Sequence, residues 1–198
     1  LNLAKILSNY VTVKILHRGP TMRLDNISFI GYKLPSLFNV RYASDLASPY
    51  VASLSIELYS RLRNELRDVD IIQVEQPFLF PPVYILTKMN NVNLPIVLDA
   101  HNVEFLTMKS KLDISHLNIN NFLTSLTLPE VFLFEKIAVK QAHVITCVSD
   151  QDRKMFNKLY KAPLEKIEVI PNGVEIEKFE KASIIHSLEG RKIIFFHG

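Results

Sequence analysis

The 198-residue sequence has one cysteine, no run of five basic residues and no apolar stretch near the ~20 residues that span a bilayer. Because Cys147 has no partner within the chain, an internal disulfide is excluded and a reducing compartment is favoured, so we expect a cytoplasmic protein. The net charge of +3 is small, and the basic residues are scattered along the chain. It is compatible with phosphate-bearing small molecules or an anionic membrane surface, and we expect no nucleic-acid partner.

Apolar runs bounded by polar residues alternate with helical patterns along the chain. They predict strands over 11–16, 27–32, 70–75, 95–99, 143–149, 166–171 and 192–197, and helices over 50–67, 78–90, 118–142 and from 149 or 150 onward. The helix over 118–142 is expected to kink near Pro129. Strands that are apolar at nearly every position are typical of parallel sheets covered on both faces. The sequence therefore predicts an α/β fold with a doubly wound parallel sheet flanked by helices.

Polar residues follow three of the predicted strands. They are Asp99, His101, Asn102 and Glu104 in "VLDAHNVE", the segment "VSD" at 148–150, and the segment "PNG" at 171–173. In open α/β sheets, ligands bind beyond the carboxyl ends of the strands. We therefore expect a ligand-binding crevice at this edge.

Each of these residues also has a structural interpretation. His101 could be a strand-end histidine that binds backbone groups, Ser149 a helix cap, and Asn172-Gly173 a simple turn. Asp99 and Glu104 could be an acid pair of the kind used in glycoside hydrolysis or could cap the loop or the next helix. The segment "DVD" at 68–70 precedes an apolar strand, so we interpret it as a turn and predict no metal site.

Three segments in this order resemble a known family: "VLDAHNVE", "FEKIAVKQAHVITCVSDQD" and "KIEVIPNGVEIEKF". They are similar to the N-terminal domain of glycosyltransferase family 4, whose GT-B architecture has two facing Rossmann-like domains. The resemblance is clearest over 70–198. It implies that 1–190 is the N-terminal, acceptor-side Rossmann-like domain without its first strand, and that 191–198 begins the C-terminal, donor-side domain. We therefore expect a piece of a longer protein.

The resemblance implies a retaining glycosyltransferase that moves a sugar from a nucleotide-sugar donor to a glycan, lipid-linked or small-molecule acceptor. No metal cofactor is expected, and the piece alone is expected to be inactive. The residues implied in catalysis and donor binding are His101, Ser149, Asn172 and Gly173, and those implied on the acceptor side are Glu75, Gln76, Asn102 and Glu104. His101 would position the donor sugar and stabilise developing charge. Glu135 matches a common acid of the family and is expected to be a structural anchor.

Two other functions stay open. A GT-B sugar-nucleotide epimerase shares the architecture, and a non-catalytic Rossmann domain could bind a sugar or nucleotide. The apolar segment 122–134 could touch the cytoplasmic face of a membrane, which would make a peripheral membrane contact. Its interrupting charges favour a helix packed on the core instead.

Overall fold

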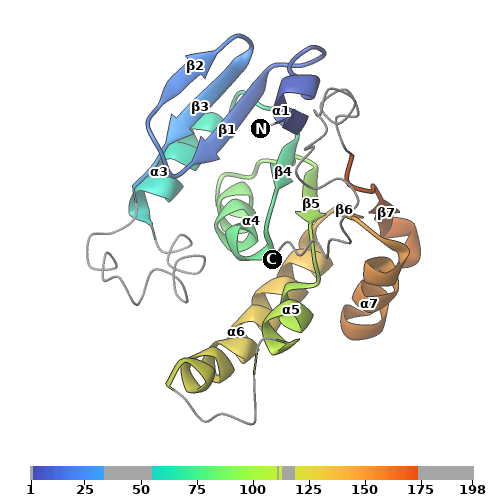
Figure 1. Ribbon diagram of the computed structural model, residues 1–198. Coiled ribbons are helices and arrows are strands. Elements are labelled where there is room, and N and C mark those ends of the chain that lie inside the picture. Colours follow the sequence, from blue (N-terminus) through green and yellow to red (C-terminus); the bar gives the residue numbers. More distant parts are fainter. Residues whose placement is uncertain (1, 34–54, 111, 113–118, 174–198) are drawn as a thin grey trace, which may run out of the picture.

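The computed structural model describes residues 2–33, 55–110, 112 and 119–173 (Figure 1). Within these ranges the strands form a three-stranded and a four-stranded sheet. The predicted strand over 192–197, the expected domain start at 191–198 and the first residues of the predicted helix over 50–67 lie outside the described residues.

The four-stranded sheet is parallel throughout, as the apolar runs predicted. Its strands are β4 (Ile72–Val74), β5 (Ile96–Ala100), β6 (Val144–Cys147) and β7 (Ile167–Val169), in that spatial order. The central strands β5 and β6 contribute Leu98 and Ile145, which are completely buried. Because successive parallel strands need a crossover connection, helices lie between them along the chain. Their arrangement is that of a Rossmann-like sheet flanked by helices.

The three-stranded sheet contains one strand in addition to the predicted ones. Strand β1 (Val13–His17) pairs in parallel with β3 (Ile27–Gly31), as expected, but β2 (Met22–Leu24) pairs antiparallel with β3. The two strands predicted in this part of the chain are therefore parallel, and the antiparallel β2 is a strand that the sequence did not predict. β2 has only three residues, all of them exposed, and its sequence "MRL" contains no apolar run that would have predicted a strand. Asp25, with φ of 51°, adopts the left-handed conformation that tight hairpin turns use.

The helices largely agree with the predicted ranges. They are α1 (Asn2–Leu7), α3 (Ile56–Glu65), α4 (Phe80–Met89), α5 (Glu104–Ser110), α6 (Ile119–Gln141) and α7 (Asp150–Tyr160), with short 3₁₀ turns at Pro77–Leu79 and Leu164–Lys166. The sequence did not predict α5. Pro129 lies inside α6 and does not divide it. The segment 68–70 joins α3 to β4, which confirms that "DVD" is a turn between helix and strand.

The core lies between the four-stranded sheet and its helices. Phe80 of α4, Val139 of α6 and Phe156 of α7 are each at most 1% exposed and pack with the strand residues. In the described part of 122–134, Val131 is buried and Leu133 is exposed, as on a helix with one face on the core. None of the described helices combines the length and apolar character needed to cross a membrane.

Candidate active site

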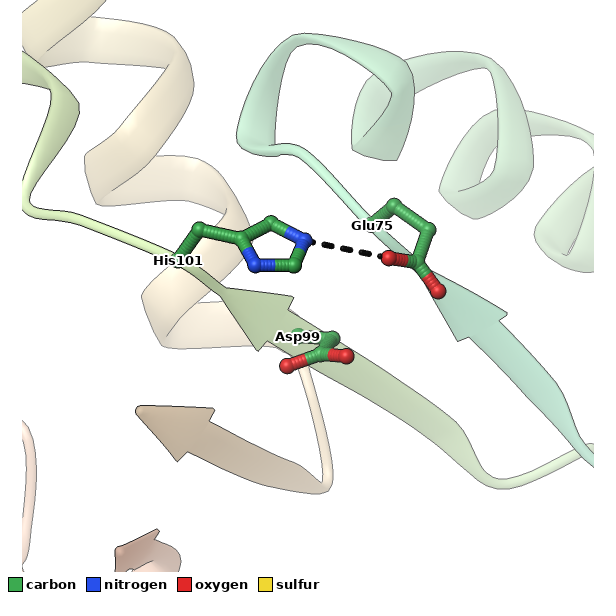
Figure 2. Close-up of side chains that lie close together, drawn as sticks. All are labelled: Glu75, Asp99 and His101. Carbon is green, nitrogen blue, oxygen red and sulfur yellow. Dashed lines mark hydrogen bonds and ion pairs between the residues drawn. The ribbon is translucent and has the colours of Figure 1, made fainter. Parts of the chain in front are cut away.

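Strands β4 and β5 end side by side and bring Glu75, Asp99 and His101 together (Figure 2). Asp99 is the penultimate residue of β5, and His101 and Glu75 directly follow the ends of their strands. Because parallel strands run in the same direction, their carboxyl ends lie along one edge of the sheet. Side chains that are 26 residues apart in the sequence therefore meet at the predicted edge.

His101 and Glu75 form a pair at this edge. Nε2 of His101 lies 3.1 Å from Oε2 of Glu75, and the two side chains are 50% and 55% exposed. A carboxylate oxygen accepts, so Nε2 donates this hydrogen bond. In the neutral ring, Nδ1 then has a free lone pair. Glu75, predicted on the acceptor side, thus also orients the imidazole.

Two further polar side chains, Gln73 and Thr146, hold the carboxylates of this edge in place. Nε2 of Gln73 donates to Oε1 of Glu75 over 2.9 Å and to Oδ2 of Asp99 over 3.0 Å. The hydroxyl of Thr146, directly opposite Asp99 in the β5–β6 register, donates to its Oδ1 over 2.6 Å. Neither residue was predicted from the sequence to be part of the site. The available signal was a polar residue inside each of the apolar runs "IIQV" and "VITC".

Glu75, Asp99 and His101 also have the donor types of a cation site. One ligand atom from each lies within 4.8 Å of the others, the one such group found in the described part of the chain. However, Gln73 and Thr146 already donate hydrogen bonds to these carboxylates. A side-chain amide between two carboxylates relieves their repulsion without a metal. The absence of a metal requirement stays a prediction.

The other predicted residues are distributed along the same edge. Ser149, after β6, caps α7: its Oγ accepts from the backbone amide of Asp152 over 3.1 Å, which confirms the capping interpretation. Asn172 and Gly173, after β7, are exposed. A side chain at Gly173 would meet no described atom within 4 Å, so packing does not require glycine there.

Around His101, the remaining predicted residues take different places. Asn102 is exposed beside it, whereas Gln76 is half-buried at the start of the 3₁₀ turn that follows β4. Glu104 is the first residue of α5, where an acidic side chain suits the helix dipole. The structure therefore groups His101 with Glu75 and Asp99. Glu104 lies at the start of a helix, which agrees with the second of the two interpretations given for it above, a helix-terminal residue rather than a member of an acid pair.

Glu135 of α6 anchors the start of α5. Its carboxylate is 1% exposed and accepts the backbone amides of Glu104 and Phe105 over 2.8 and 3.1 Å. It also accepts the hydroxyl of Tyr160. Burial raises the pKa of Glu135, although these three donors act in the opposite direction. The expected role as a structural anchor agrees with these contacts.

The geometry is that of an α/β domain with a polar, solvent-accessible group at the carboxyl edge of a parallel sheet. Comparison with protein families gives a more specific class: the model of Glycosyltransferase Family 4 matches residues 1–178. The chain therefore belongs to glycosyltransferase family 4. Its parallel four-stranded sheet flanked by helices is the N-terminal Rossmann-like half of a GT-B fold. No curated protein sequence gives a significant match to the chain.

Proposed function

We propose that this domain belongs to a retaining glycosyltransferase in which His101 contacts the sugar of a nucleotide-sugar donor. Family membership supports binding of such a donor and an acceptor. The observation that carries the assignment of His101 is its place: it is half exposed at the carboxyl edge of the sheet and is held by Glu75. A histidine that served the fold alone would have its ring turned toward backbone groups, as His143 does at the opposite end of β5.

In this proposal Glu75 fixes the plane of the imidazole, and Nδ1 faces the sugar. A neutral Nδ1 accepts from a sugar hydroxyl, whereas a protonated ring donates and stabilises negative charge on the leaving group. The gain comes from holding one orientation rather than from proton abstraction. Ser149, Asn172 and Gly173 are the donor-side residues of the proposal.

The acceptor is proposed to approach from the side of β4, toward Gln76, Asn102 and Glu104. The base and diphosphate of the donor are assigned to the facing GT-B domain. It follows that residues 1–198 by themselves turn over no nucleotide sugar. The acceptor is a glycan, a lipid-linked sugar or a small molecule, and cytoplasmic location with a peripheral membrane contact remains part of the proposal.

The test is His101→Ala in the full-length protein, assayed with a panel of UDP-, GDP- and ADP-sugars. Loss of one hydrogen bond that strengthens in the transition state should lower turnover about 30- to 1000-fold. Nucleotide affinity should change less than about twofold, because the other domain holds the nucleotide. Turnover, nucleotide binding and the melting temperature are measured on the same preparation.

His143→Ala is the matched control. His143 borders the amino end of β5, and its Nδ1 accepts the backbone amide of Ile96 over 3.0 Å. This control should lower the melting temperature and leave turnover unchanged. If His101→Ala behaves like the control, with full turnover and lower stability, the proposed role of His101 is wrong.

The same assay separates the other functions. An epimerase would change the configuration of the nucleotide sugar without any acceptor, and a binding module would release no nucleotide. Transfer by purified residues 1–198, lost on His101→Ala, would contradict the assignment of the diphosphate contacts to the facing domain.

A further inference from the structure

The connection that carries His101 is short and fixed at both ends. On one side, Ala100 is the last residue of β5 and pairs with Cys147 of β6. On the other side, Val103 is 3% exposed, and its carbonyl accepts the amides of Leu106 and Thr107. Only His101 and Asn102 lie between the strand and this buried residue. The position of the imidazole therefore depends on how both ends are held.

The start of α5 has no cap of its own. Val103 occupies the position that usually carries Ser, Thr, Asp or Asn, whose side-chain oxygen accepts an amide of the first turn. A valine has no such oxygen. Two amides of the first turn are instead satisfied from another helix, by the carboxylate of Glu135, which lies 31 residues further along the chain from Glu104.

The carboxylate is itself fixed by its surroundings. Tyr160 of α7 donates its hydroxyl to the same oxygen, Oε2, that accepts the amide of Phe105. Around it, the ring of Phe132 lies 5.2 Å from the ring of Phe105 and 5.2 Å from that of Tyr160. Three helices thus meet at one buried carboxylate, and the residues it holds are three and four positions after His101.

We propose that Glu135, held by Tyr160, is a positioning residue for His101: it fixes the first turn of α5 and thereby the short connection that presents the imidazole to substrate. This inference rests on the proposed function of His101 and adds a second element to that site. A local cap would satisfy one end of one helix. A carboxylate from α6 also ties α5 to α6 and α7, so the connection cannot shift independently of the core.

Two variants disrupt the hydrogen bonds of the Glu135 carboxylate to different degrees. Tyr160→Phe removes only the phenol hydroxyl and keeps the aromatic packing. Glu135→Gln leaves one oxygen acceptor and turns an NH₂ group toward one of the two amides, so that amide loses its partner. Misplacement of a reacting group by about 1 Å can lower turnover ~100-fold. We expect a drop of roughly threefold or more for Tyr160→Phe and about tenfold or more for Glu135→Gln, with unchanged nucleotide affinity.

The second measurement is the NMR signal of the His101 imidazole in isotope-labelled full-length protein, assigned by its loss in His101→Asn. A loss of stability that does not move the imidazole would leave this signal unchanged. Both variants should shift this signal. The matched control is Ser55→Ala. Ser55 is 1% exposed, and its hydroxyl also binds backbone groups: it accepts the amide of Leu58, which caps α3, and it donates to the carbonyl of Lys33. The control should lower stability and leave the His101 signal and turnover in place.

The outcomes separate the two proposals. If His101→Ala keeps full turnover, the proposed function of His101 fails, whatever the NMR signal does. If His101→Ala lowers turnover but Tyr160→Phe leaves both the His101 signal and turnover as in Ser55→Ala, the positioning role is overturned. Because Tyr160→Phe retains the carboxylate and the packing, it tests the inference even if Glu135→Gln does not fold.

Discussion

Replacing Glu135 with methionine should strongly destabilise the domain, although it exchanges a buried acid for an apolar side chain of similar length. Buried ion pairs can often be replaced by apolar residues at little cost, because both partners are removed together. Here two of the three partners are backbone amides, of Glu104 and Phe105. No substitution can remove them. The acid therefore cannot be exchanged without leaving buried donors unpaired.

The expected magnitude follows from these contacts. Each buried donor without a partner costs roughly 1–3 kcal/mol, and Glu135→Met leaves the two amides and the hydroxyl of Tyr160 in that state. Part of this cost is offset, because the carboxylate no longer has to be desolvated, and that desolvation is large enough to raise the pKa of Glu135. We expect a net loss of about 2–4 kcal/mol in the free energy of unfolding.

The assay is urea unfolding near neutral pH, with Tyr160→Phe and the double variant measured alongside. Tyr160→Phe alone should cost roughly 1–2 kcal/mol, but in the Glu135→Met background it should be neutral or stabilising, since its hydroxyl no longer has that partner. A Glu135→Met protein within about 0.5 kcal/mol of wild type, or a double variant equal to the sum of the single ones, would refute the reasoning.

Three further predictions concern pH, packing and metal. Burial raises the pKa of Glu135 in the folded protein above its usual 4.5. The stability that protonated Glu135 contributes is therefore fully present below pH 4.5 and is lost as the pH rises through the raised pKa of the folded state. In urea unfolding at increasing pH, wild type should accordingly lose stability relative to Glu135→Gln. Gly31→Ala should cost about 2 kcal/mol or more in urea unfolding, because its Cβ would lie 1.9 Å from the carbonyl oxygen of Gly19. Gly19→Ala should cost less, because the three atoms nearest to its Cβ belong to the His17 side chain, which can move more easily than backbone. EDTA should leave transfer by the full-length protein unchanged, as should Asp68→Ala and Asp70→Ala; loss of activity in all three would contradict the prediction that 68–70 holds no metal.

The sequence predicted most of the fold because the relevant signals are local. The apolar runs at 95–99 and 143–149 identify buried parallel strands whatever surrounds them. Capping chemistry is also local, so the start of α7 at Ser149 was predicted within one residue. The strand β2 and the helix α5 were missed because neither carries such a signal: β2 is three exposed residues, and α5 begins after a valine.

What the sequence by itself determined is which side chains stand at the ends of strands, because chain direction and strand boundaries are properties of each segment. Asp99, His101 and Ser149 were placed at the carboxyl edge on that basis. Only the tertiary structure decided which of them touch, because the register between β4 and β5 brings Glu75 to His101 and lets Gln73 reach Asp99. Register depends on packing across the whole sheet. For the same physical reason, a cap supplied from 31 residues away can be found only in the folded chain.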